Sequence, residues 1–399
     1  GSSSRERLRR ALDTCEVLSR RHDCVVANPP YMGSSSFGPF MSRWVKKGYP
    51  DVKSDLFSSF VVRMFDLAKD HGECGVMSPF VWMFIGSYEK LRNEIIDNRT
   101  LTSLIQLEYS GFAGATVPIC TYTFHNSFIK GYKGGYVRLS NFVGASVQAP
   151  KALEAIKNPD CGWFYRRDAE TFRQIPGTPI AYWASDGLFD AFEAGPLAKK
   201  VPVKKGLDTG DNDRFLRYWH EVDFSKLGIG YDSARSFLQS GSKWAPHDKG
   251  GDFRKWYGNN DWIINWGFDG MELKASSANL RSPQFYFQRV ITWSALSSGR
   301  PGFRLSDQGA LSNTAGSSMF PEEKDISSVL AYMNSSVVLK ALELLAPTLN
   351  YSAGPVGSVP LMPDNIDRCP EISDMCVSIS KGDWDSSETS WNFKRHPLV

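Results

Sequence analysis

The sequence predicts an α/β domain followed by a second, mixed α+β domain. Three observations lead to this prediction. Apolar runs with strand character alternate with amphipathic helical segments up to about residue 148. From about residue 150, tryptophan, tyrosine, glycine and proline become dense and the regular alternation is lost. One long helical pattern then follows at 324–346. The order strand, helix, strand, helix, strand favours a mostly parallel sheet that helices cover.

The elements of the first domain are predicted from the spacing of apolar residues. Residues 23–27 (DCVVA) form a short apolar run closed by Pro29 and Pro30, which predicts a buried strand. Segment 54–70 has helical spacing, with Ser54 as a candidate N-cap. The other predicted elements are a helix at 87–98 and strands at 72–79, 101–108 and 119–127.

Four regions are expected along the chain. Residues 1–22 are expected to form an N-terminal helix, and residues 1–4 (GSSS) have the composition of an expression scar. Residues 23–148 are the first domain and residues 149–365 the second. The polar residues 366–399 are expected to be an irregular tail.

Composition narrows the class of protein. The chain has 399 residues, of which 42% are hydrophobic and 22% charged, with a net charge of +3. This balance excludes an acidic disordered protein and a binder driven by a basic tail, but it permits a local basic face. No apolar run approaches the roughly 20 residues of a membrane span. The seven cysteines contain no CxxC pair and the six histidines are scattered, so we expect a cytoplasmic, reduced protein without a metal site.

The tetrapeptide Asn28-Pro29-Pro30-Tyr31 ends the first predicted strand. Ligands of open α/β sheets bind at the carboxyl ends of the strands. The Asn28 amide oxygen and the Pro29 carbonyl would place two acceptors at one point, since proline offers no N–H. Two such acceptors can hold both hydrogens of a planar amine. Tyr31 offers a ring on which the nucleobase that carries this amine can stack. Methylation of an adenine amine, flipped out of the duplex, requires this arrangement. An ordinary Pro-Pro turn stays an alternative for these four residues alone.

The segment DCVVANPPYMG resembles motif IV of adenine-N6 DNA methyltransferases of the γ class. Later blocks resemble the PglX-type methyltransferases of bacteriophage-exclusion (BREX) systems and fused restriction-modification enzymes. These blocks include YPDVKSDLFSSF, GLDTGDNDRFLRYWHEV, KGGDFRKWYGNNDWIINW and APTLNYSAGPVGSVPL. The resemblance covers about residues 20–365. It implies the second half of a Rossmann-like methyltransferase sheet followed by a target-recognition domain.

The resemblance also implies roles for single residues. Asn28 and the Pro29 carbonyl would hold the adenine N6, with Tyr31 stacked on the flipped base. Phe112 in GFAGATVP would pack on the other side of the base, although a loop anchor is an alternative for it. Asp55 and Phe57 in SDLFSSF would help to form the S-adenosylmethionine pocket, although Phe57 also fits a helix core.

The family's glycine-rich cofactor loop is expected before NPPY, where only 27 residues stand. Gly228-Ile229-Gly230 is a weak candidate for a permuted loop, since no convincing strand precedes it. We therefore expect the carboxyl-terminal portion of a longer enzyme, which binds S-adenosylmethionine poorly by itself. A chain with the missing N-terminal half, or other defence-system proteins, are candidate partners.

Double-stranded DNA is the expected substrate and partner. No association with a membrane is expected. A recognition domain contacts phosphates with cations and reads base edges with polar side chains. The candidate DNA-binding residues are Lys204, Lys205, Asn212, Arg214, Lys249, Arg254, Lys255, Arg300 and Arg304. Each of them taken alone also fits an ordinary solvated residue.

Two other functions stay open at this point. A methyltransferase of protein glutamine or of RNA would use the same NPPY chemistry, but the second domain of roughly 200 residues disfavours it. A non-catalytic DNA-specificity or interaction module would explain the missing cofactor loop.

Overall fold

The computed structural model describes residues 2–109, 117–297, 299–346, 350–361, 369–396 and 398. The chain divides into two units, the first ending at Asp190 and the second beginning at Ala191. The first unit thus extends well beyond the expected boundary at residue 148. The reason is that Phe164–Asp168 adds a sixth strand to its sheet, paired with Lys133–Arg138.

The first unit is built on a six-stranded mixed sheet in the order β1-β2-β4-β3-β5-β6. Its strands are β1 (His22–Ala27), β2 (Ala68–Pro79), β3 (Thr100–Gln106), β4 (Ile119–His125), β5 (Lys133–Arg138) and β6 (Phe164–Asp168). The expected mostly parallel sheet holds for β1, β2, β3 and β5, which run in one direction. Strands β4 and β6 run against them, because β4 returns between β2 and β3 as the partner of both.

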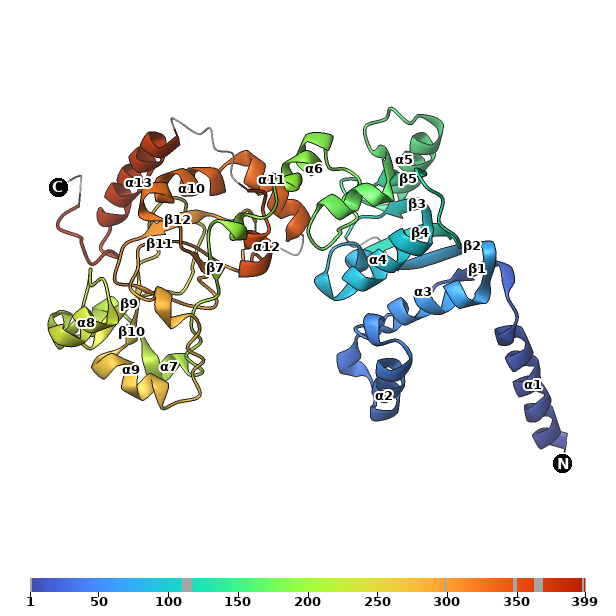
Figure 1. Cartoon of the computed structure of the whole chain (residues 1–399), viewed down its shortest axis with the longest axis horizontal. Helices are drawn as coiled ribbons and strands as arrows, with labels where there is room; N and C mark the ends of the chain where they lie inside the picture. Colours follow the sequence, from blue (N-terminus) through green and yellow to red (C-terminus); the bar gives the residue numbers. More distant parts are fainter. Residues whose placement is uncertain are drawn as a thin grey trace. The chain divides into compact units, whose positions relative to one another are not determined.

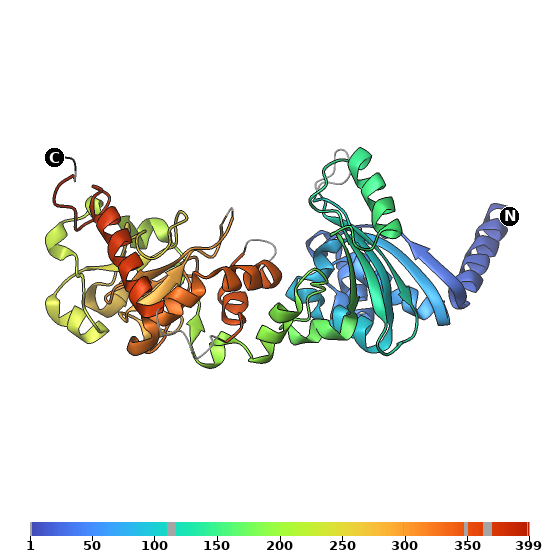
Figure 2. The same cartoon turned by 90° about the horizontal axis from the view of Figure 1, so that it is seen from above.

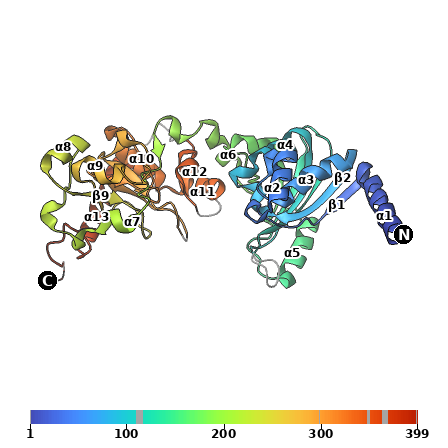
Figure 3. The ribbon, with the colours of Figure 1, turned by 90° about the horizontal axis from the view of Figure 1, so that it is seen from below.

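Helices cover both faces of this sheet (Figures 1 and 3). The helices of the unit are α1 (Ser2–Ser19), α2 (Pro39–Gly48), α3 (Leu56–Leu67), α4 (Glu89–Asn98), α5 (Ala145–Lys157) and α6 (Asp186–Glu193), which crosses the unit boundary. Helix α3 packs on β1 and β2, and α4 packs on β3. Helix α5 covers the other face, where Ala155 packs on Val137 and Leu139. Figure 2 shows α1 standing apart from the sheet beside β1.

Strand β1 is where the sequence predicted it, but it is not buried. None of its six residues is fully buried, and the Val26 side chain is 76% exposed. The expectation of a buried strand is therefore wrong, because β1 is the edge strand of the sheet and pairs only with β2. An exposed edge with apolar side chains is a surface that other strands can join.

The second unit contains two small four-stranded sheets, ordered β13-β9-β10-β8 and β12-β11-β14-β7. Their strands are β7 (Val203–Lys204), β8 (Leu216–Tyr218), β9 (Trp244–Asp248), β10 (Trp262–Asn265), β11 (Val290–Trp293), β12 (Phe303–Ser306), β13 (Leu311–Ser312) and β14 (Ser318–Met319). The helices are α7 (Asn212–Phe215), α8 (Ala234–Ser240), α9 (Gly267–Lys274), α10 (Ile326–Met333), α11 (Ser336–Leu345), α12 (Ala353–Gly357) and α13 (Cys369–Asp385). One core joins Trp293 and Phe303 to α10 and α11, and a second surrounds Trp266 and Phe287.

Two expectations for the carboxyl-terminal part are corrected. The helix expected at 324–346 is broken into α10 and α11, because the Asn334 side chain binds the backbone of Phe303 and Ser335 caps α11. The expected irregular tail contains a helix of 17 residues, α13, which packs against α10. Serine and glycine within α13 lower its intrinsic helix propensity, so tertiary packing stabilises it.

Among the described helices, none is by itself long and apolar enough to cross a membrane. The segments Glu323–Met333 and Ser336–Leu345 reach that length and composition only together, with a 72° bend between them.

Candidate active site

Asn28 lies at the carboxyl edge of the first sheet. Ala27, the last residue of β1, pairs with Val76 in the parallel strand β2, so Asn28 follows directly beside Met77. Its side chain is exposed, whereas Pro29 is buried. Neither Pro29 nor Pro30 has an N–H to continue the ladder, so the two prolines end the strand. The sequence-predicted placement of the Asn28 amide at a strand end is confirmed.

Tyr31 folds back onto this amide. Its Oη lies 3.1 Å from Asn28 Oδ1 and 3.4 Å from the Met77 carbonyl oxygen, and its single hydrogen can be donated to one of them. The Tyr31 side chain is 38% exposed, and partial burial raises the pKa of its hydroxyl. Among the described residues, no hydrogen bond reaches the Pro29 carbonyl. One of the two expected acceptors is thus open, and Tyr31 holds the other.

The chain after Tyr31 is fixed by Asp55. The Asp55 Oδ1 accepts hydrogen bonds from Met32 N at 3.1 Å and from Phe57 N at 3.2 Å, so the carboxylate caps α3 and anchors the loop together. The Met32 carbonyl in turn accepts from Leu56 N at 2.9 Å. Burial raises the pKa of Asp55. Through these bonds Asp55 fixes the backbone that directly follows Tyr31.

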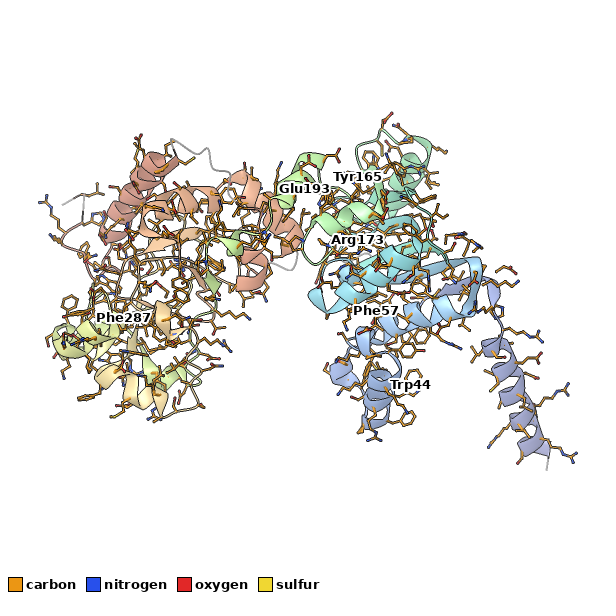
Figure 4. The ribbon with its side chains drawn as sticks, viewed as in Figure 1. Trp44, Phe57, Tyr165, Arg173, Glu193 and Phe287 are labelled. Carbon is orange, nitrogen blue, oxygen red and sulfur yellow. The ribbon has the colours of Figure 1, made fainter. Side chains whose placement is uncertain are left out.

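Phe57 does not have the surface that a cofactor contact requires. Its side chain is 0% exposed and packs on Tyr88, with 5.5 Å between ring centroids. Figure 4 labels Phe57 on α3. The expected cofactor contact of the Phe57 side chain is therefore corrected. Phe57 shares the buried side of α3 with Val61 and Met64, four and seven residues further along the helix.

The remaining predicted residue of this site, Phe112, lies outside the described residues, which stop at Tyr109 and resume at Val117. The flanks of that segment meet at the edge that carries Asn28. Leu107 N donates to the Ile119 carbonyl at 3.1 Å, and Ile119 pairs with Pro79 at the end of β2.

Gly228-Ile229-Gly230 does not have the surroundings of a glycine-rich cofactor loop. Gly228 and Gly230 lie in the second unit, after a short 3-10 turn rather than a strand. Gly228 is packed so closely on Phe237 and Ser242 that a Cβ would lie within 3 Å of both side chains. Protein side chains therefore occupy the space beside Gly228 that a cofactor would need. This packing does not support a permuted cofactor loop. No group of three or more metal-ligating side chains occurs in the described parts of the chain.

The chain is similar in sequence to several known methyltransferases. Residues 6–112 match the model of the Eco57I restriction-modification methylases. The chain is 36% identical over 393 residues to the adenine-specific methyltransferase BrxX of Escherichia coli O9:H4 (strain HS), covering 96% of this chain and 31% of BrxX. It is 33% identical over 406 residues to the adenine-specific methyltransferase PglX of Lacticaseibacillus casei (strain Zhang), covering 98% of this chain and 34% of PglX. The chain is homologous to BrxX and PglX. It spans about a third of the length of these curated relatives.

Solved structures with a similar fold include the type IIL restriction-modification enzyme MmeI, determined in complex with DNA. The TM-score is 0.55 at 14% identity, and the match covers 93% of this chain and 50% of that one. A nuclease-deletion mutant of the type ISP enzyme LlaGI, in complex with a DNA substrate mimic, gives a TM-score of 0.50 at 10% identity, covering 95% and 43%. At these identities the likeness concerns the fold.

The predicted DNA-binding residues of this BrxX and PglX homologue differ in their surroundings. Lys204, Lys205, Asn212, Arg214 and Arg300 are exposed. The others have contacts within the chain. Lys249 Nζ lies 3.5 Å from the centroid of the Trp262 ring, Arg254 pairs with Asp383 at 3.6 Å, and Lys255 donates to the Asn334 carbonyl at 3.3 Å.

Arg304 is the clear exception among them, because it is only 2% exposed. Its neighbours on β12, Phe303 and Leu305, belong to the hydrophobic core, so Arg304 points to the opposite face of the strand. The expectation that Arg304 is a surface group is wrong. Burial lowers the pKa of Arg304 to about 10, and the charges of Asp248 and Asp261 oppose that shift.

Sequence reasoning also missed a cavity of about 570 Å³ in the second unit, lined in part by His247, Asp248 and Trp262. Burial raises the pKa of Asp248 to about 6 and lowers that of His247 to about 3. His247 Nε2 lies 3.1 Å from Asn313 Nδ2, and Ser306 donates to Asp248 Oδ1 at 2.9 Å. The sequence signal was the polar pair His247-Asp248 inside an otherwise apolar strand.

Proposed function

We propose that this chain carries the base-binding half of the catalytic sheet and the target-recognition unit of a DNA adenine-N6 methyltransferase. The observation that carries this proposal is the position of Asn28 at a strand end, with Tyr31 on its amide and an open Pro29 carbonyl beside it. Homology to two adenine-specific methyltransferases over nearly the whole chain supports it. The resemblance to PglX-type methyltransferases makes phage exclusion of the BREX type the proposed setting.

In this proposal the two acceptors hold the two hydrogens of the adenine N6. Holding both hydrogens in a plane localises electron density on the nitrogen and raises its nucleophilicity. In this proposal Tyr31 moves off Asn28, because its hydroxyl lies 3.1 Å from the same Oδ1. Its ring would move from the amide to the face of the flipped base, where stacking contributes about 1–3 kcal/mol. The hydrogen bond given up is worth about 1 kcal/mol, so the exchange is favourable.

S-adenosylmethionine is the proposed methyl donor, and its binding site is assigned to a segment outside this chain. The free edge of β1 is the proposed place where that segment joins. An edge strand with a 76% exposed valine offers both unpaired backbone groups and apolar surface to an added strand. A strand paired there would lie next to Asn28. The six-stranded sheet would then be the second half of a Rossmann-like methyltransferase sheet.

The second unit is the proposed reader of DNA sequence. Its exposed candidates Lys204, Lys205, Arg214 and Arg300 suit phosphates, and Asn212 suits a base edge or a sugar. A non-catalytic specificity module is the second candidate function. It is favoured for the chain in isolation because Gly228, in the glycine pair weighed as a permuted cofactor loop, packs against Phe237 and Ser242. Methylation of RNA or of protein glutamine has no such support.

The test combines this chain with the segment that precedes the matching region in its relatives, labelled S-adenosylmethionine and unmethylated duplex DNA. The expected product is label on the N6 of adenine after hydrolysis of the DNA. Each component alone is expected to give none. Label in added RNA or protein, or no label with a chain that binds DNA, would contradict the proposal, and the latter result would favour the specificity module.

A further inference from the structure

We call Asn28, Pro29 and Tyr31 the clamp, since they are proposed to hold the adenine. Helix α2 presents an aromatic and basic face that the clamp does not use. Phe40, Arg43, Trp44 and Lys47 follow the spacing i, i+3, i+4, i+7, so they share one side of the helix. Phe40 is 73% exposed and Trp44 49% exposed, and Figure 4 shows Trp44 on α2 away from the sheet. Val45 is the one fully buried residue of this helix. Two large aromatic side chains in water on a helix held by so little burial indicate a surface that a partner covers.

The charge of this segment is one-sided. Residues 24–50 contain Arg43, Lys46 and Lys47 and no acidic residue. None of these three cations forms an ion pair with a described acid. Asp51, the next acid along the chain, is paired with Lys90, and Asp55 accepts backbone hydrogen bonds. Unpaired cations interleaved with exposed rings fit a nucleic acid, whose phosphates take the cations and whose bases take the rings.

The backbone holds α2 next to the clamp. Ser34 N donates to the Ser54 carbonyl at 2.9 Å, and Leu56 N donates to the Met32 carbonyl at 2.9 Å. The two ends of the segment 33–54, which contains α2, therefore lie side by side, directly after Tyr31. Any DNA whose base reaches Asn28 must pass beside this point.

We propose that the face of α2 formed by Phe40, Arg43, Trp44 and Lys47 binds the DNA strand that flanks the target adenine. Arg43 and Lys47 contact its phosphates, and Phe40 and Trp44 pack on the bases or sugars left exposed when the adenine flips. This inference rests on the proposed function. It assigns a DNA contact to the catalytic unit, in addition to the recognition unit.

The test measures binding of a labelled duplex DNA to the full chain as salt concentration rises. The double variant Arg43→Gln with Lys47→Gln removes two cations, so the slope of log K against log salt is expected to fall by about 1.8, at 0.9 per phosphate contact. The matched control, Lys130→Gln with Lys133→Gln, removes the same charge at the start of β5, where the amino ends of the parallel strands lie and not the carboxyl ends that carry Asn28. It should leave the slope unchanged.

The aromatic residues are tested separately. Phe40→Ala with Trp44→Ala is expected to weaken binding about tenfold or more with an unchanged salt slope, because stacking is not a counterion effect. Leu153→Ala with Ile156→Ala removes exposed apolar side chains from α5 as the control. All these side chains are exposed, and thermal unfolding checks that each variant folds.

Three results separate the outcomes. If the Arg43 and Lys47 variant changes the slope no more than its control, the α2 contact is refuted while the proposed function stands. If the 19F resonance of fluorotryptophan at position 44 shifts on adding the upstream segment without DNA, the face binds protein, which overturns the inference. If the wild-type chain has no salt-dependent affinity for DNA, the proposed function itself fails.

Discussion

The Tyr31 hydroxyl lies 3.1 Å from the Asn28 amide oxygen, so the side chain expected to stack on the adenine contacts the acceptor that is proposed for the adenine amine. In this state the clamp is closed by its own aromatic residue. Base entry then requires Tyr31 to rotate, which exchanges a hydrogen bond for a stacking contact. Substitutions of Tyr31 can separate the contribution of its hydroxyl from that of its ring.

Tyr31→Phe removes the hydroxyl and keeps the ring, so methylation by the complete enzyme is expected to change less than about threefold, within the worth of one neutral hydrogen bond. Tyr31→Ala removes the ring and should lower kcat/KM by about 10-fold to 100-fold, the value of one stacking contact. Steady-state kinetics of both variants measure the difference. Equal losses in the two would show that the ring does not stack.

Asp55 is expected to stabilise the fold through its hydrogen bonds to the backbone of Met32 and Phe57. Asp55→Ala should lower the free energy of unfolding by about 1–2 kcal/mol, because α3 loses its N-cap and Met32 loses its anchor. Asn at this position caps as well as Asp, so Asp55→Asn should cost only a fraction of that. Urea unfolding of the two variants decides. A stability loss with Asn as large as with Ala would indicate that the negative charge itself is required.

The free edge of β1 gives a prediction about assembly. Val26→Asp should leave the unfolding of this chain nearly unchanged, because the side chain is 76% exposed. The same charge would be buried beside an added strand, where an unpaired carboxylate is costly, so restoration of activity by the upstream segment should be lost. Val26→Thr is the matched control and should retain activity. Full activity of the Val26→Asp variant would show that the upstream segment does not pair with β1.

The sequence located the clamp more accurately than it located the surroundings of the clamp. The run DCVVA predicts a strand and the two prolines fix its end, so Asn28 and Tyr31 could be placed from local rules. Local rules do not say which strands lie side by side, so the exposure of β1 could not be foreseen. Arg304 was misplaced for a related reason. The alternation Phe303-Arg304-Leu305 predicts that Arg304 faces away from Phe303, but not that another layer covers it.

His247 predicts a pH dependence of stability. The unfolded pKa is about 6.5 and burial lowers the folded value to about 3. The unfolded chain therefore binds the extra proton, and the stabilisation is complete above pH 6.5 and is lost as pH falls towards 3. Relative to His247→Asn, the free energy of unfolding of the wild type should fall by up to about 1.4 kcal/mol per pH unit in that window.

The neighbouring Asp248 opposes this effect, since burial raises its pKa to about 6 and its stabilisation is largest at low pH. Comparing the wild type with His247→Asn at each pH cancels the contribution of Asp248 to first order. Urea unfolding between pH 4 and 7 provides the values. A difference that stays constant over this range would mean that His247 titrates with the same pKa in the folded and the unfolded chain.

The central claim is that Asn28 holds the adenine amine, and the most direct measurement is the N6-methyladenine content of cellular DNA. Cells would express the complete protein that contains this segment, with Asn28→Ala or with Asn98→Ala, an exposed asparagine on α4, as the control. The account predicts methylated adenine at the same sites in the wild type and the Asn98 variant. It predicts at least a 100-fold loss in the Asn28 variant, about 3 kcal/mol of lost hydrogen bonding to a group whose charge develops during transfer. Undiminished methylation in the Asn28 variant, with the protein present at the same level, would contradict the account.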